Sequence, residues 1–139
     1  LTATLKDLSR GAMDVEPILQ SFKHSQHLRV GVRDILNRDD IQATHRALAD
    51  IAEVCLAEIT RREYAQLVAK YGEPTIRGGE HAGETCSLVL LALGKLGGRE
   101  PNYHSDLDLV FLYEAEGMTK AIYPSRRDKT TRTNTSSAS

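Results

Sequence analysis

Two apolar runs of strand length, separated by a glycine-rich polar segment, constrain the fold of this chain more than any other feature. The first is C-S-L-V-L-L-A-L, Cys86 to Leu93, and the second is L-D-L-V-F-L-Y, Leu107 to Tyr113. Runs of this length without polar alternation are typical of strands covered on both faces. We therefore expect two buried strands joined by the segment G-K-L-G-G-R-E-P-N-Y-H-S-D.

The sequence upstream of these strands has helical periodicity. An aliphatic stripe recurs from Ile41 to Tyr71 at helical spacing, which predicts one long helix or two helices joined near Thr60. Gly72, followed closely by a proline, supplies the stop. A further helix is expected over 27–37, and the stretch before it is expected to be broken at Gly11 and Pro17.

The N-cap of the long helix is expected at Asp39 or Asp40, since both residues directly precede the periodic stripe. These signals divide the chain into a helical unit, 1–72, a polar linker, 73–85, and a strand-bearing region, 86–117. The basic, Ser/Thr-rich stretch 118–139 has no apolar period and is predicted to be a mobile tail. Helices followed by strands indicate an α+β fold.

Bulk properties exclude several classes of protein. The net charge near −1 gives no global field for holding nucleic acid or an anionic membrane. No apolar run approaches the roughly 20 residues needed to span a bilayer. Cys55 and Cys86 lack the spacing of a disulfide framework or a zinc site, which favours a reducing, cytoplasmic location.

Asp106 and Asp108 stand two residues apart at the start of the second apolar run. Alternation along a strand would project both carboxylates from one face, where they can share a hard cation such as Mg²⁺. An isolated D-x-D is more often a solvated strand entrance. Here the neighbouring apolar residues make two adjacent like charges costly unless a cation compensates them.

The glycine turn Gly94 to Gly98 directly follows the first apolar run. Glycines permit positive φ and a close approach of backbone N–H groups to an anion, and Lys95 adds a positive charge for phosphate. The pattern is neither G-x-G-x-x-G nor a P-loop. Taken alone, Gly94, Gly97 and Gly98 indicate only a tight turn.

The spacing of the two motifs is what makes the region recognisable. Ser105 opens S-D-L-D eleven residues after Gly94, an arrangement that resembles the polymerase-β-like nucleotidyltransferases. More narrowly, L-G-K-L-G-G-R-E-P-N-Y-H-S-D-L-D-L-V-F-L-Y-E resembles glutamine synthetase adenylyltransferase, whose catalytic halves carry G-K-L-G-G-x-E-L-x-x-x-S-D-x-D-L-x-F. Pro101 and His104 depart from that pattern, and neither departure touches the carboxylates.

The resemblance implies an enzyme that transfers AMP from ATP to a tyrosine of glutamine synthetase, or removes it by phosphorolysis. Asp106 and Asp108 would be the catalytic Mg²⁺ ligands, Gly94, Lys95, Gly97 and Gly98 the phosphate cradle, and Ser105 a hydrogen-bonding support. Glutamine synthetase is the implied protein partner, and a PII-type signalling protein is a further candidate. Region 86–117 would hold the first strands of a truncated, nucleotidyltransferase-type mixed sheet.

The family also has a third carboxylate in a later V-D-x-R-L-R-P-like segment, which this sequence does not contain. We therefore expect the isolated chain to have little activity. The residues do not decide between the adenylylating and deadenylylating halves. Two other readings stay open: another protein nucleotidyltransferase, such as a uridylyltransferase, and a non-catalytic helical interaction module built on residues 20–74.

Overall fold

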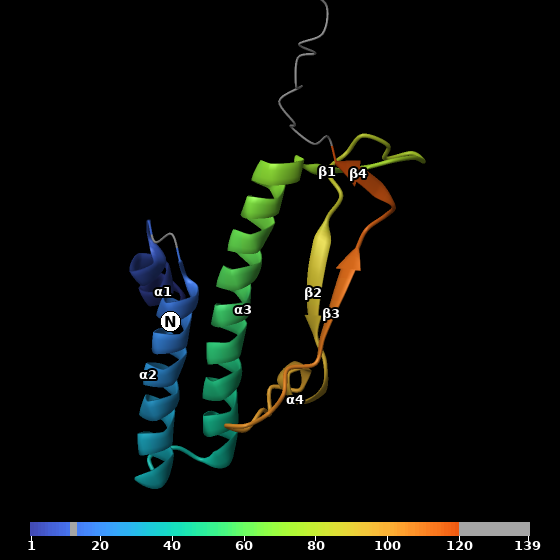
Figure 1. The fold of residues 1–139 in the computed structure, drawn as a ribbon. Coiled ribbons are helices and arrows are strands. Elements are labelled where there is room, and N and C mark those ends of the chain that lie inside the picture. The colour runs from blue at the N-terminus through green and yellow to red at the C-terminus, as the bar shows by residue number, and fades with distance from the viewer. Residues whose placement is uncertain (12–13, 120–139) are drawn as a thin grey trace, which may run out of the picture.

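A computed structural model describes residues 1–11 and 14–119 of the chain, and it has two long helices and a shorter one beside two small sheets (Figure 1). The helices are α1 (Thr2–Ser9), α2 (Glu16–Ile35) and α3 (Ile41–Tyr71). The later elements are β1 (Pro74–Ile76), β2 (Leu88–Ala92), α4 (Gly94–Gly97), β3 (Leu109–Tyr113) and β4 (Gly117–Thr119). This architecture confirms the α+β class.

Helix α3 runs unbroken for 31 residues, so the alternative of two helices joined near Thr60 is wrong. Of the two candidate caps, Asp40 is the one used: its carboxylate accepts a hydrogen bond from the Ala43 N–H at 2.6 Å. The helix ends at Gly72, which has φ of 85° and donates its N–H to the Val68 carbonyl at 2.8 Å. A positive φ is accessible to glycine because it has no Cβ.

Helix α2 covers the predicted helical segment 27–37 as far as Ile35, and it begins earlier than expected, at Glu16. Pro17 therefore lies in its first turn and does not break the chain. Proline is tolerated there because the first N–H groups of a helix have no acceptor within the helix. The structure also forms α1 ahead of it, between Leu1 and Arg10.

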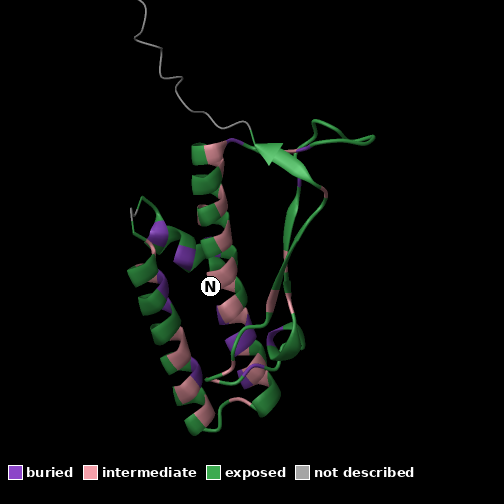
Figure 2. Cartoon of the chain, turned by 45° about the vertical axis from the view of Figure 1, so that its right-hand side comes forward, coloured by how far each residue is buried: buried purple, intermediate pink, exposed green. Residues whose placement is uncertain are grey.

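The helical unit has its core between α2 and α3, as the buried residues in Figure 2 show. One cluster joins Leu5 of α1 to Leu19 and Phe22 of α2. The other joins Val30 of α2 to Leu48 and Ile51 of α3. Apart from Phe22 the named residues of both clusters are aliphatic, as suits helices packed through one apolar stripe.

A buried carboxylate ties α1 to α3. The Glu58 side chain is only 4% exposed, and it accepts hydrogen bonds from Ser9 Oγ at 3.0 Å and from the guanidinium groups of Arg61 and Arg62. The Arg61 hydrogen bond, supported by those of Arg62 and Ser9, lowers the pKa of Glu58 to about 2. The carboxylate is therefore ionised at neutral pH.

Strands β2 and β3 form an antiparallel hairpin in which Leu90 pairs with Phe111. Strands β1 and β4 form a second antiparallel pair, with Thr75 opposite Met118. Segment 73–85, expected as a linker, thus contributes a strand of its own. Within 118–139, residues 118 and 119 belong to β4, and the rest of the expected tail lies outside the described residues.

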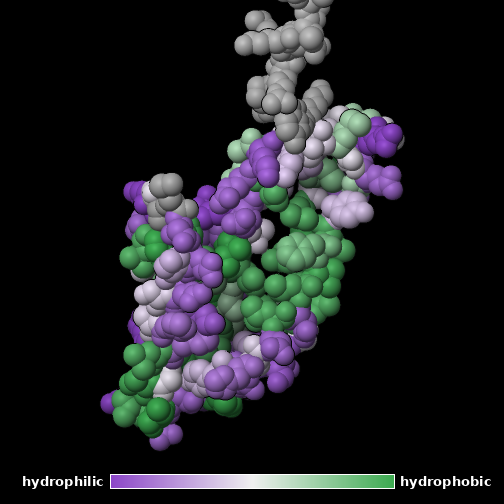
Figure 3. Space-filling view, viewed as in Figure 1, coloured by the Kyte–Doolittle hydropathy of each residue, from purple (hydrophilic) through white to green (hydrophobic). Residues whose placement is uncertain are grey.

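The hairpin is less covered than its sequence predicts. Val89, Leu91, Val110 and Leu112 lie on its outer face, and all four are exposed. Figure 3 shows hydrophobic residues gathered over the hairpin on the side that it views. The expectation of strands covered on both faces is wrong for the described residues, because a two-stranded sheet has no neighbouring layer on that side.

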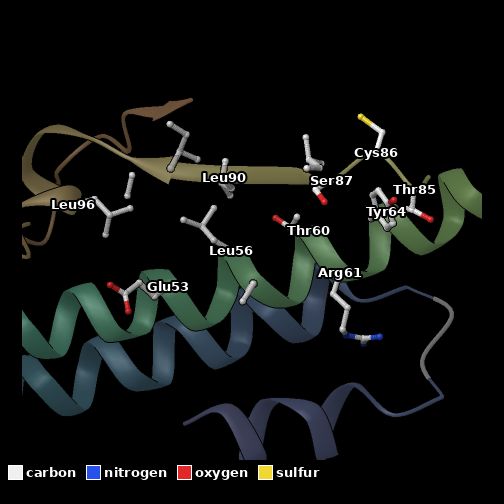
Figure 4. Close-up of a pocket in the computed structure, with 14 residues that line it drawn as sticks. Glu53, Leu56, Thr60, Arg61, Tyr64, Thr85, Cys86, Ser87, Leu90 and Leu96 are labelled. Atoms are coloured by element: carbon white, nitrogen blue, oxygen red, sulfur yellow. The ribbon is translucent and has the colours of Figure 1, made fainter. Parts of the chain in front are cut away.

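The inner face of the hairpin borders an open cleft of about 680 Å³ between α3 and β2 (Figure 4). Leu56 and Thr60 of α3 line it on one side, and Leu88 and Leu90 line it on the other. The hairpin and the helices are therefore held together mainly at their ends. Within 1–11 and 14–119, no helix is long and apolar enough to cross a membrane.

Candidate nucleotidyltransferase site

The glycine turn forms one short helical turn, α4, at the end of β2. Gly94 has φ of 55°, and its carbonyl accepts a hydrogen bond from the Gly98 N–H at 3.0 Å. Gly97 donates its N–H to Leu93, also at 3.0 Å, and a Cβ there would lie 2.5 Å from the Ala92 carbonyl oxygen. Gly94 thus supplies a left-handed backbone, and Gly97 supplies the space for the turn to fold back on β2.

Asp108 lies directly against this turn. Its carbonyl accepts a hydrogen bond from the Leu93 N–H at 2.8 Å, and a Cβ on Gly94 would collide with the Asp108 carboxylate. The turn and the S-D-x-D motif, separated in sequence, therefore meet at one end of the β2–β3 hairpin.

Asp106 and Asp108 are both exposed and both precede β3, which begins at Leu109. In the part of the chain that the structure describes, neither carboxylate forms a side-chain hydrogen bond or ion pair. Their oxygens are therefore available to a ligand. Lys95, on α4, is likewise exposed, and its side chain has no partner among the described residues.

Ser105 closes the turn that precedes the two aspartates. Its Oγ accepts a hydrogen bond from the Asn102 N–H at 2.9 Å and donates one to Asn102 Oδ1 at 2.7 Å. The Ser105 N–H donates in turn to the Asn102 carbonyl at 3.2 Å. These bonds shape the chain just before Asp106, a geometry suited to a supporting role.

The donor set is compatible with a hard divalent cation. Mg²⁺ is bound by oxygen ligands, commonly one or two carboxylates completed by water and substrate phosphates. Asp106 and Asp108 offer two such carboxylates, whose oxygens have no hydrogen-bond or ion-pair partner among the described residues. Over residues 1–11 and 14–119, no cluster of three or more His, Cys, Asp or Glu residues could hold a metal ion, so other oxygen donors would have to complete the coordination shell.

Two residues of the loop between α4 and β3 bind the helical unit, and the sequence reasoning assigned neither of them a role. The Arg99 guanidinium donates to Asp50 and Glu53 of α3. The Tyr103 hydroxyl donates to Asp34 Oδ2 of α2 at 3.3 Å. The sequence carried only a weak signal for Tyr103: it is an aromatic residue in a polar loop, in a chain where aromatic residues make up only 5%.

Comparison with known proteins decides the family. The family model described as glutamate-ammonia ligase adenylyltransferase matches residues 2–133. The chain belongs to this family. The match covers nearly the whole sequence, including the helical unit as well as the glycine turn and the two aspartates.

Individual members of the glutamate-ammonia ligase adenylyltransferase family agree. Each of the following is named a bifunctional glutamine synthetase adenylyltransferase/adenylyl-removing enzyme. The protein of Thioalkalivibrio sulfidiphilus is 38% identical over 106 residues, covering 76% of this chain and 10% of the relative. That of Alteromonas mediterranea is 33% identical over 107 residues, covering 77% and 10%. That of Shewanella loihica is 31% identical over 122 residues, covering 86% and 12%.

The chain therefore spans about a tenth of the length of the curated relatives that it matches. It matches one segment of each of these longer relatives. Membership in the family is thus shown for this segment, whereas the activity of such a whole enzyme is a matter for proposal.

Proposed function

We propose that the chain supplies the glycine turn and two metal-binding carboxylates of a site that transfers AMP between ATP and glutamine synthetase. The observation that carries this proposal is the seating of Asp108 against Gly94, with neither aspartate side chain bonded to any residue that the structure describes. Family membership supports it, since the relatives are named for addition and removal of an adenylyl group on glutamine synthetase.

Each residue has a distinct part in the proposed site. Asp106 and Asp108 would hold Mg²⁺, which when bound would neutralise charge at the α-phosphate of the adenylyl group being transferred. Backbone N–H groups of the Gly94 to Gly98 turn and the Lys95 ammonium hold the phosphates of ATP. Ser105 fixes the chain before Asp106 through Asn102. In the forward direction a tyrosine hydroxyl of the protein substrate is the nucleophile: its oxygen bonds to the α-phosphorus of ATP, and pyrophosphate leaves.

The partners and compartment follow from the same proposal. Glutamine synthetase is the protein substrate, and a PII-type signalling protein remains a prediction for the whole enzyme. Cys55 and Cys86 are both free thiols. This suits the reducing cytoplasm, where the chain would encounter glutamine synthetase.

The metal site is tested directly with Mn²⁺, a paramagnetic substitute for Mg²⁺, added to the ¹⁵N-labelled chain. Amide resonances of the glycine turn and of residues 105–109 are expected to broaden. Asp106→Asn and Asp108→Asn should each abolish the broadening, because each removes one ligand charge. Glu116→Gln is the matched control, since it removes an exposed carboxylate at the far end of β3. Broadening that survives both aspartate substitutions would refute the metal site.

Nucleotide choice separates this function from that of a uridylyltransferase. ATP should displace a fluorescent adenine nucleotide from the Mn²⁺-loaded chain more effectively than UTP does. Asp106→Asn separates the proposed function from that of a non-catalytic helical module. The module would keep its glutamine synthetase binding unaltered, whereas the proposed site would lose nucleotide binding.

We expect the isolated chain to transfer little AMP. Transfer at the rate of a full-length relative would contradict the need for a third carboxylate.

A further inference from the structure

The loop from Gly98 to Ser105 is the place where the proposed site meets the helical unit. Figure 1 shows it crossing from the hairpin to one end of α3. Along the middle of the hairpin, the open cleft of about 680 Å³ separates β2 from α3. Packing along the strands therefore does little to hold the hairpin on the helices, and the loop contacts gain importance.

Arg99 forms the first of these contacts and adopts an unusual backbone conformation to do so. Its φ is 57°, in the left-handed region that non-glycine residues rarely occupy. Its guanidinium donates one hydrogen bond to Asp50 and another to Glu53, which lie one turn apart on α3. Arg99 directly follows Gly98, so this fork fixes the end of the glycine turn relative to α3.

The Arg99 contact acts as a geometric restraint more than as a source of stability. The side chains involved are 42% to 50% exposed. Exposed ion pairs contribute little to folding because water and salt screen them. The guanidinium is planar, however, and offers donors in a fixed fork, so binding two carboxylates sets its direction.

Tyr103 forms the second contact, with α2. Its ring packs against the core cluster of Val30, Leu48 and Ile51. It lies over Gly31, where an added Cβ would be 3.9 Å from the Tyr103 hydroxyl oxygen. Burial, and then the neighbouring Asp34 carboxylate, raises the pKa of the Tyr103 phenol. The hydroxyl therefore stays protonated and remains a donor to Asp34.

The two contacts lie close to the proposed catalytic groups in the chain. Tyr103 precedes Asp106 by three residues, and an extended chain spans at most about 3.6 Å per residue. The Asn102–Ser105 turn shortens this connection further. A displacement of Tyr103 from α2 is therefore transmitted to Asp106 through this hydrogen-bonded turn.

We propose that Arg99 and Tyr103 are positioning residues that hold the Gly94–Asp108 site in place by anchoring its loop to α3 and α2. The role in metal binding rests on the proposed function, whereas the anchoring itself does not. In this arrangement the helical unit is a structural part of the site, because α2 and α3 hold the loop that joins the glycine turn to the aspartates.

The test uses three substitutions in the 139-residue chain. Arg99→Asn removes the guanidinium but keeps a residue that tolerates positive φ. Tyr103→Phe keeps the packed ring and removes only the hydroxyl, and Tyr103→Ala removes both. Arg10→Asn is the control, since it removes an exposed ion pair with Asp7 on α1, away from the site.

Two quantities are measured for each variant: the Mn²⁺ dissociation constant, and hydrogen exchange of the loop amides that are bonded in the structure. Arg99→Asn and Tyr103→Ala should each weaken Mn²⁺ binding by about tenfold, a typical effect of removing a group that orients metal ligands. Exchange at Gly98 and Ser105 should accelerate, while helical circular dichroism stays at the parent level. Tyr103→Phe should have a Mn²⁺ dissociation constant and loop exchange rates between those of the parent and Tyr103→Ala. Arg10→Asn should match the parent in both.

A charge reversal checks that the Arg99 contact itself is responsible. Arg99→Glu should weaken Mn²⁺ binding and loosen the loop, and adding Asp50→Lys and Glu53→Lys should restore both. Unchanged loop exchange in Arg99→Asn and Tyr103→Ala would overturn the proposal. The proposal would also be overturned if these variants exchange faster but bind Mn²⁺ with the affinity of the parent, in a chain where Asp106→Asn abolishes Mn²⁺ binding. If Asp106→Asn leaves Mn²⁺ binding intact, the proposed metal site fails, and the exchange data decide the anchoring alone.

Discussion

At the scale of single residues, the three glycines of the turn meet different physical demands. Gly94 has a left-handed backbone and lies against the Asp108 carboxylate. Gly97 has no room for a Cβ beside the Ala92 carbonyl. Gly98 has φ of −76°, and a Cβ there would first meet the flexible Glu100 side chain at 3.4 Å. The motif letters alone do not show that Gly94 and Gly97 are more restricted than Gly98.

The first prediction follows from that difference. Gly97→Ala should destabilise the chain by about 1 to 3 kcal/mol, as overpacking against a fixed backbone atom does. Gly98→Ala should change the free energy of unfolding much less, because the Glu100 side chain can move aside. Urea unfolding of both variants measures the difference. Equal effects of the two substitutions would show that the turn does not pack on β2 as described.

Sequence reasoning was effective for residues whose partners are close in the motif and failed for those whose partners are distant. The spacing of Gly94 and Asp108 indicated one site, and the structure brings these two residues together. The roles proposed for the site residues remain predictions. Arg99 and Tyr103 escaped notice because their partners lie 46 to 69 residues away in the sequence, and no local pattern records such pairings.

At the scale of elements, α3 shows how strongly local signals act when they agree. Its periodic stripe, its cap and its terminal glycine predicted one helix, or two joined near Thr60, over Ile41 to Tyr71, and the structure has a single helix with these limits. β1 was not predicted, since Pro-Thr-Ile carries no strand pattern. It forms because β4, more than 40 residues later, provides the hydrogen-bonding partner.

The N-cap of α3 gives the second prediction. Asp40→Ala should cost about 1 kcal/mol of stability, because the Ala43 N–H loses its acceptor. Asp40→Ser should retain most of the stability, since a hydroxyl can accept the same bond. Thermal unfolding followed by circular dichroism at 222 nm is the measurement. A cap role is excluded if the serine and alanine variants melt alike.

The third prediction concerns pH and the attachment of α1 to α3. The folded pKa of Glu58, about 2, lies below its ordinary value of 4.5, because Arg61, Arg62 and Ser9 bind the ionised form. Its contribution to stability is therefore complete above pH 4.5 and is lost as the pH falls from 4.5 toward 2. Stability falls as the pH falls because the fold stabilises this carboxylate in its charged state.

Glu58→Gln isolates this contribution. At pH 7 the variant should be less stable than the parent by about 1.5 to 3 kcal/mol, the usual worth of hydrogen bonds to a charged group. The two proteins should converge as the pH approaches 2. Urea unfolding at a series of pH values measures both curves. A difference that is constant from pH 7 to pH 2 would contradict the assigned pKa.

At the scale of the whole molecule, the hairpin is an apolar layer without a covering layer on its outer face. Val89, Leu91, Val110 and Leu112 are between 37% and 49% exposed. Sequence predicted the apolar character of these strands correctly and their burial wrongly, because burial depends on neighbours that no strand pattern specifies. Contiguous apolar surfaces of this kind favour association in water.

The fourth prediction is that the isolated chain associates with itself as its concentration rises. Val89 and Leu112 are cross-strand partners, so Val89→Lys with Leu112→Glu places an attractive charged pair on the outer face. This double variant should remain monomeric at concentrations where the parent associates, with the hairpin still formed. Sedimentation velocity makes the comparison. Equal association of the two proteins would place the contact elsewhere.

The cleft between α3 and β2 also bears on how sharply the chain unfolds. The dependence of unfolding free energy on denaturant concentration, and the heat capacity of unfolding, both grow with the surface newly exposed to water. Surface that already faces the solvent in the folded state adds to neither quantity. Urea titration and calorimetry should therefore give a shallower slope and a smaller heat-capacity change than a closed domain of equal length. A ligand that fills the cleft should steepen the transition.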